Sequence, residues 1–159
     1  MAISRKACSR CGKPVSIQVV PRISGTEGAY KLELEDVSVM ICAENHKRFV
    51  YPDLAMRVMD HIANPDTGGL YAATQRGLFK KRAHCAKCST ELAPGEPEIK
   101  DYRVSVSLPD IQPVTVTLTA PVLKCAQCAT LQLPDTAHFM KYVLKAMTHA
   151  FRSADIHAE

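Results

Sequence analysis

The sequence contains no tryptophan, few aromatic residues and no long apolar segment. Aromatic residues make up 6% of its 159 residues, and the longest stretch without a charged side chain, residues 111–123, contains two prolines. A membrane-spanning helix needs about 20 consecutive apolar residues, so we expect none here. With 47% apolar and 23% charged residues, the composition is that of a globular protein with one medium or two small domains.

Cysteine is the residue type that stands out among those present. There are seven cysteines, and an odd number excludes a fully paired disulfide framework. The first six residues, Met-Ala-Ile-Ser-Arg-Lys, are not followed by an apolar leader, so we expect a protein of the reducing cytoplasm. Six cysteines form Cys-x-x-Cys pairs, and the seventh, Cys42, precedes His46 by four residues. The three pairs are Cys8/Cys11, Cys85/Cys88 and Cys125/Cys128.

This spacing is typical of metal ligands. Two cysteines that flank a tight turn place their sulfurs on the same side of the backbone, and two such turns complete the closed tetrahedron of structural zinc. The sequence therefore predicts two zinc ions per chain. The first ligand set is Cys8, Cys11, Cys42 and His46, and the second is Cys85, Cys88, Cys125 and Cys128. Two alternatives stay open, namely His61, a carboxylate or water in place of His46, and iron in the four-cysteine set.

The two ligand sets divide the chain into similar halves, residues 1–77 and 78–159. Between the ligands of each half, apolar and polar residues alternate as in strands, at residues 15–19 and 31–41 and again at 104–108 and 114–119. The alternation changes phase at residues 35–36, which suggests a β-bulge. Amphipathic helical patterns follow, one after Pro52 and a longer one capped by Asp135 or Thr136. We expect an α+β fold of two zinc ribbons, each followed by a helix, with the last helix packed on its own ribbon.

The ligand pattern resembles the zinc-ribbon fold group over nearly the whole chain, as two copies. The second half also resembles the YgiT-type zinc fingers of bacterial antitoxin proteins, through its two cysteine pairs and the strand at residues 114–124 that leads into Cys125. This resemblance implies a zinc-stabilised module that contacts proteins near a transcriptional regulator. Ala129 stands where that family usually has glycine, and no helix-turn-helix pattern is present, so only the four cysteines are carried over, as zinc ligands.

The charge pattern leaves the partner open. The formal net charge is +4, and seven metal-bound thiolates with two divalent ions would lower it to about +1. We expect a non-enzymatic module that contacts proteins within a larger assembly, with no membrane and no small-molecule substrate. One alternative is a nucleic-acid-binding ribbon, and another is a thiol redox or metal-relay protein. The candidate nucleic-acid contacts are Arg10, Lys13, Lys80, Lys81, Arg82 and Lys87.

Overall fold

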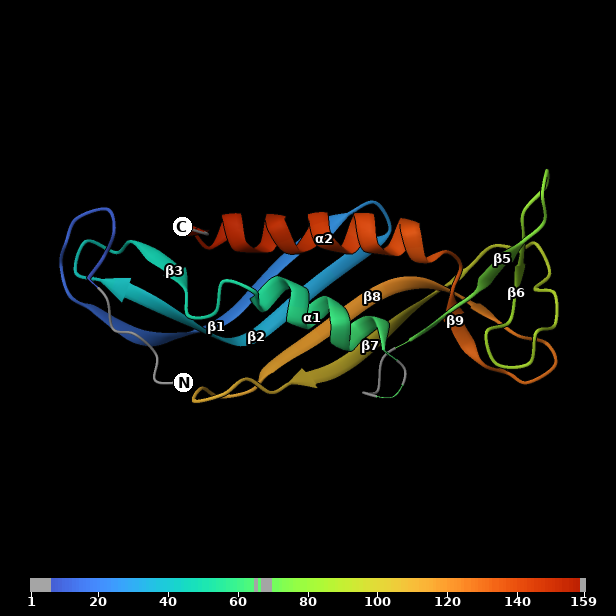
Figure 1. The fold of residues 1–159 in the computed structure, drawn as a ribbon, viewed down its shortest axis with the longest axis horizontal. Coiled ribbons are helices and arrows are strands. Elements are labelled where there is room, and N and C mark those ends of the chain that lie inside the picture. Colours follow the sequence, from blue (N-terminus) through green and yellow to red (C-terminus); the bar gives the residue numbers. More distant parts are fainter. Residues whose placement is uncertain (1–6, 65, 67–69, 158–159) are drawn as a thin grey trace.

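The computed structural model describes residues 7–64, 66 and 70–157, and over these residues the chain has a mixed α+β fold (Figure 1). Two helices pack against a large sheet, and α2 lies along one side of the molecule (Figure 1). In chain order the elements are β1 (Val15–Glu27), β2 (Tyr30–Cys42), β3 (Lys47–Phe49), α1 (Leu54–Ala63), β4 (Tyr71–Ala72), β5 (Thr74–Arg76), β6 (Arg82–His84), β7 (Glu98–Val106), β8 (Val114–Lys124), β9 (Leu131–Leu133), α2 (Thr136–Ser153) and β10 (Ile156–His157).

The sheet is built from two hairpins, β1–β2 and β7–β8, which join through their second strands. Strands β2 and β8 pair antiparallel, so that Leu32 lies opposite Leu118 and Leu34 opposite Val116. Beyond this shared segment, β3 continues along β2 and β9 continues along β8. Among the described residues, eight strands therefore form one sheet that contains strands of both halves.

The change of phase within β2 has a different origin from the expected bulge. Val20 pairs with Val37 and Arg22 with Glu35, so no extra residue interrupts the register between β1 and β2. Instead, Asp36 adopts a left-handed conformation with φ of 62°. It lies where β2 stops pairing with β8 and goes on toward β3, so the backbone twist at Asp36 moves the buried face from one side of the strand to the other.

Each helix, together with the strand that follows it, lies on the hairpin of the other half. Helix α1 packs against β7, and its successor β4 pairs with β9. Helix α2 packs against β1 and β2, and its successor β10 pairs with β3. The expectation that α2 would pack on its own ribbon is therefore wrong. Because β3 and β9 run antiparallel to the strands before them, the chain leaves each ligand set toward the middle of the molecule and reaches the other half (Figure 1).

A glycine allows α2 to approach β1 closely. A Cβ atom built on Gly25 would lie 2.0 Å from the carbonyl oxygen of Ala146 and 2.5 Å from the nitrogen of Ala150. The small alanines provide the matching surface on the helix, and both are fully buried. The N-terminus of α2 is capped as predicted, since the Asp135 carboxylate accepts hydrogen bonds from the backbone N–H groups of Ala137 and His138.

The basic segment between the halves is a β-hairpin rather than a simple linker. Strands β5 and β6 pair antiparallel, and the predicted boundary at residue 77 falls in the turn between them. Neither described helix is long and apolar enough to cross a membrane.

Candidate metal centres

The two predicted ligand sets lie at opposite ends of the molecule. Strands β2 and β8 run antiparallel. Strand β2 ends at the ligand Cys42, and β8 ends at Lys124, directly before the ligand Cys125. The pairing therefore directs the two ends of the hairpins away from each other (Figure 1). The structure brings all eight predicted residues together into two groups whose sulfur and nitrogen atoms lie within 4.8 Å of one another.

The first group consists of three thiols and one imidazole. Nδ1 of His46 lies 3.6 Å from Sγ of Cys8 and 3.5 Å from Sγ of Cys42. The sulfurs of Cys11 and Cys42 are 3.6 Å apart. His61, the alternative ligand, lies on α1 instead, where its Nδ1 is 3.1 Å from the carbonyl oxygen of Arg57. The structure thus places His46, and not His61, beside the three thiols.

The second group consists of four thiols. Sγ of Cys85 lies 3.6 Å from Sγ of Cys128, and Sγ of Cys88 lies 3.5 Å from Sγ of Cys125. These separations are far longer than the roughly 2.05 Å of a disulfide bond. Cys85 and Cys125 are almost fully buried, whereas Cys88 is exposed.

The distances in both groups fit a tetrahedral ion. Zinc–sulfur bonds of about 2.3 Å separate two sulfurs by about 3.8 Å, and a zinc–nitrogen bond of about 2.0 Å gives a sulfur–nitrogen separation of about 3.6 Å. The observed 3.5–3.6 Å values agree with both. Each group can hold one metal ion with four protein ligands.

Four similar backbone turns position these ligands. In three of them, the N–H four residues after the first cysteine donates to that cysteine's carbonyl, as Gly12 does to Cys8, Ser89 to Cys85 and Ala129 to Cys125. The donor residue has a positive φ in every case, 69° at Gly12, 62° at Ser89 and 58° at Ala129. Glycine adopts this conformation without steric cost, and serine and alanine adopt it here as well.

The fourth turn is one residue shorter, which explains why a histidine completes the first group. Here Asn45 has the positive φ of 62° and donates to the carbonyl of Cys42 from only three residues away. His46 follows it, at the position that Thr90 and Thr130 occupy in the second group. The hydroxyl oxygens of these threonines lie 3.2 Å from Sγ of Cys88 and Cys128. At these three positions the side chain faces a cysteine, and an imidazole is long enough to join the ligand group.

The same turns favour ionisation of the first cysteine in each half. Burial raises the pKa of Cys8, but hydrogen bonds from the backbone of Cys11 and Arg10 and from His46 bring its pKa down to about 6. Cys85 behaves alike: burial raises its pKa, while the backbone of Cys88 and the side chain of Gln132 lead the hydrogen bonds that bring it to about 6. Thiolate is the form that binds metal, so both turns prepare a ligand.

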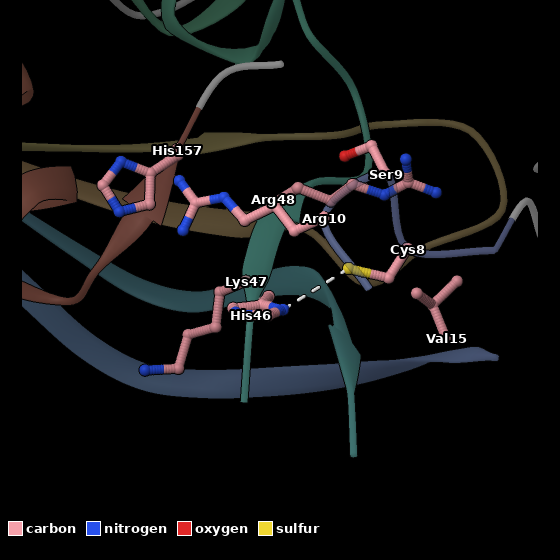
Figure 2. Close-up of a pocket in the computed structure, with 8 residues that line it drawn as sticks. All are labelled: Cys8, Ser9, Arg10, Val15, His46, Lys47, Arg48 and His157. Carbon is pink, nitrogen blue, oxygen red and sulfur yellow. Dashed lines mark hydrogen bonds between the residues drawn. The ribbon is translucent and has the colours of Figure 1, made fainter. Parts of the chain in front are cut away.

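A small pocket of 70 Å³ adjoins the first group (Figure 2). Figure 2 shows Cys8 and His46 pointing toward each other at its edge, with Arg10 and His157 among the other lining residues. Asp155 lies beside these side chains: Nε2 of His157 lies 2.5 Å from its carboxylate, and this contact leads the effects that lower the pKa of Asp155, with smaller contributions from Lys47 and Arg10. The pocket thus belongs to the surroundings of the first metal group.

The predicted nucleic-acid contacts do not form one surface. Lys13 is ion-paired with Glu44 beside the first group. Arg82 forms an ion pair with Glu91, in which Nη1 of Arg82 lies 3.0 Å from Oε1 of Glu91. Within the described part of the chain, Lys80, Lys81 and Lys87 make no ion pair, and they lie on or next to the β5–β6 hairpin at the second end.

Sequence reasoning missed the polar residues that support the second group. Gln132 is fully buried, and its Oε1 accepts a hydrogen bond of 2.9 Å from the N–H of Ala86 inside the first cysteine turn. Thr90 and Thr130 contact sulfurs. Their only signal in the sequence is that Thr90 and Thr130 each follow a second cysteine by two residues and that Gln132 follows Cys128 by four.

Comparison of the chain with protein-family models, with curated proteins and with solved structures found no match. The resemblance to zinc ribbons therefore stays a prediction, and the functional argument depends on the geometry of the two groups.

Proposed function

We propose that the protein binds two structural zinc ions and acts, without catalysing a reaction, as a module that contacts another protein within a larger assembly. The observation that carries this proposal is the closure of both groups by four ligand atoms at tetrahedral spacing. A structural zinc site uses four protein ligands, whereas a catalytic site keeps one position for water or substrate.

The donor types support zinc as the metal. Thiolate and imidazole are the ligands that zinc prefers, and a set of three cysteines and one histidine favours zinc over iron. Bound zinc would fix the turns around Cys8, Cys42, Cys85 and Cys125 and hold the ends of both hairpins in place. Because the sequence has no tryptophan and few aromatic residues, we expect the ions to supply much of the folding free energy.

The exposed side of α2 supports a protein partner. Met140 and Leu144, one helical turn apart, are 37% and 45% exposed, while Phe139, Val143 and Met147 are buried against the sheet. Adjacent exposed apolar residues on an ordered helix fit a contact with another protein.

Native mass spectrometry of the purified protein tests the metal proposal. We expect two zinc ions per chain and one in His46→Ala, because this variant lacks the fourth ligand of the first group. His61→Ala serves as the control and should keep both ions. Zero or one zinc in the wild-type protein, or equal zinc loss in the two variants, would contradict the proposal.

The same measurement on the complex purified from its own cell tests the interaction proposal. A protein partner should be found with the wild-type chain and be lost from a Met140→Ser/Leu144→Ser variant that still holds two zinc ions. Rapid reaction of the native thiols with a thiol reagent would instead favour the redox alternative, because zinc-bound thiolates are protected.

A further inference from the structure

The hairpin of β5 and β6 displays two apolar side chains almost completely to solvent. Leu78 is 95% exposed and Phe79 is 102% exposed, and both lie in the turn of this hairpin. We name the whole hairpin, residues 74–84, the arm. The arm projects beyond the second end of the molecule (Figure 1). Large apolar side chains with so little cover on an ordered hairpin indicate a contact surface.

The backbone of the arm is held by a required glycine in its turn and by hydrogen bonds at its base. Gly77 has φ of 120°, and a Cβ atom there would lie 2.3 Å from the carbonyl oxygen of Lys80, so only glycine fits this turn. The base is held on three sides: Ala73 donates to Leu133, Leu92 donates to Ala83, and Nε2 of Gln75 donates to the carbonyl of Pro134 at 2.8 Å. The backbone that carries Leu78 and Phe79 is therefore held at its base and shaped at Gly77.

The charge of the arm is of one sign. Arg76 lies directly opposite Arg82 in the strand pair, and Lys80 and Lys81 lie in the turn between them. Like charges directly opposite each other destabilise a strand pair. Glu91 contacts Arg82, and within the described residues no acidic side chain forms an ion pair with Arg76, Lys80 or Lys81. An anionic partner would compensate these cations.

We propose that the arm binds nucleic acid, with Phe79 stacked against a base beside Leu78 and with Arg76, Lys80 and Lys81 on the flanking phosphates. Apolar wedges and aromatic rings flanked by Lys and Arg are the groups that engage base steps and single-stranded bases. A guanidinium fork such as that of Arg76 matches a phosphate group. This inference goes beyond the proposed function, since it assigns a second contact surface and a second class of partner.

Magnitudes favour nucleic acid over the two other anionic partners. A stable protein interface buries about 800 Å² on each side, whereas one aromatic side chain buries only about 150–250 Å². A single long acyl chain gives only marginal membrane binding, and Leu78 with Phe79 offers less apolar surface than that. Phosphate contacts, in contrast, supply most of the free energy of nonspecific nucleic-acid binding. The cations also continue along β6 to Lys87 in the next turn, which suits a linear polyanion.

Fluorescence anisotropy with the full-length, zinc-loaded protein tests the arm. The probes are labelled 20-nucleotide single-stranded DNA and RNA and a 20-base-pair DNA duplex, and they show which form is bound. We expect dissociation constants in the micromolar range at 50 mM salt, with affinity falling about 20- to 40-fold at 200 mM if Arg76, Lys80 and Lys81 each contact one phosphate. Absence of binding to every probe at 50 mM salt, with two zinc ions present, overturns the proposal that the arm binds nucleic acid and leaves the metal proposal intact.

Two variants assign any binding to the arm. Phe79→Ala should weaken binding about 5- to 100-fold by loss of stacking. Lys80→Ala/Lys81→Ala should reduce the slope of log affinity against log salt by about 1.4–1.8. The control, Lys141→Ala/Lys145→Ala, removes the same charge from α2 and should leave the slope unchanged. Equal effects in the two double variants overturn the proposal.

A binding measurement with lipid vesicles tests the alternative of a membrane contact. Vesicles of phosphatidylcholine with about one third phosphatidylglycerol present anionic headgroups to the same cations. We expect that any binding of the protein to these vesicles is the same for the wild-type protein and for Phe79→Ala. Binding to these vesicles that depends on Phe79, without binding to the nucleic-acid probes, overturns the proposal in favour of a membrane contact.

Discussion

The two ends of the molecule have the same construction but different surroundings. At each end, two turns with similar backbone hydrogen bonds bring four ligand atoms together at the open end of a hairpin, before its first strand and at or after the end of its second. At the first end one turn is shorter by a residue, and His46 takes the place that threonine holds at the second end. The shorter turn still completes its group, because the residue after its left-handed position supplies the fourth ligand atom.

The surroundings differ in charge and in shape. Beside the first group the basic side chains have acidic partners, Glu44 for Lys13 and Asp155 for His157. Beside the second group the arm carries cations without such partners and two exposed apolar side chains. The arrangement of the ligands is therefore duplicated, while the exposed apolar and basic side chains of the arm occur at the second end.

The largest effect is expected from loss of one ligand. Cys42→Ser and Cys125→Ser each remove a sulfur from a different group, and structural zinc supplies about 10–16 kcal/mol of apparent binding free energy, comparable to the whole stability of a domain. Because each helix lies on the other hairpin, we expect either variant to unfold both halves together. Circular dichroism and amide NMR spectra check this.

Two outcomes bear on that expectation. Ser105→Ala, on the exposed side of β7, serves as the control and should keep a wild-type spectrum. If the intact half of Cys42→Ser or Cys125→Ser keeps dispersed amide signals and one zinc ion, then the two halves fold independently and the exchange of helices does not couple them.

The next effect concerns the contact between α2 and the first half. Gly25→Ala places a methyl group against the backbone of Ala146 and Ala150, and we expect a loss of about 3 kcal/mol in the free energy of unfolding, at the upper end for overpacking. Urea denaturation measures it. Gly95→Ala meets no atom within 4 Å and should change the stability by less than about 0.5 kcal/mol. Similar losses in the two variants would show that α2 does not depend on close approach to β1.

A smaller effect is expected from the loss of Gln132, a buried side chain that supports the second group. Gln132→Leu removes the side chain that favours the Cys85 thiolate and holds the N–H of Ala86. We expect zinc affinity at the second group to fall about 10- to 100-fold, the usual cost of losing such a partner, with no change at the first group. Competition with a chromophoric chelator resolves the two ions. Gln127→Leu, an exposed glutamine in the Cys125 turn, is the matched control, and a loss at the first group would contradict this role.

The smallest effect concerns the left-handed turn residues. Gly12→Ala should lower the free energy of unfolding by about 1 kcal/mol, because nothing within 4 Å of its Cβ position adds a steric cost to the strained backbone. Ala129→Gly should raise it by less than about 1 kcal/mol, since alanine at φ of 58° is already strained. Thermal unfolding of the zinc-loaded protein measures both. Changes of the same sign would show that the two turns are not equivalent.

The features that the sequence predicts well are local ones. The helix patterns after Pro52 and after Asp135 and the alternation in β8 follow from residues that are neighbours in the chain, and α1, α2 and β8 are all present. The candidate ligands were predicted because four short spacings repeat, and the structure brings them together. That they bind zinc stays a prediction.

The features that the sequence did not predict depend on partners far away in the chain. The buried stripe of α2 fits either hairpin, and only the pairing of β2 with β8 decides which one lies beneath it. Strands β3, β4, β9 and β10 have two or three residues each, too few for a period of two to appear. The two strands of the arm have three residues each and the predicted boundary at residue 77 lies between them, and Gln132 lies on β9 without any motif around it.

The exchanged helices also determine the order in which the chain can fold as it is synthesised. Strand β3 pairs with β10, at residues 156–157, and α1 needs β7 for its docking surface. An emerging first half therefore exposes apolar surface that is covered only after more than half of the chain has followed. Contacts of such large sequence separation slow folding and leave intermediates prone to aggregation. Early zinc binding by Cys8, Cys11, Cys42 and His46, all made before α1, would hold the first hairpin in shape during that interval.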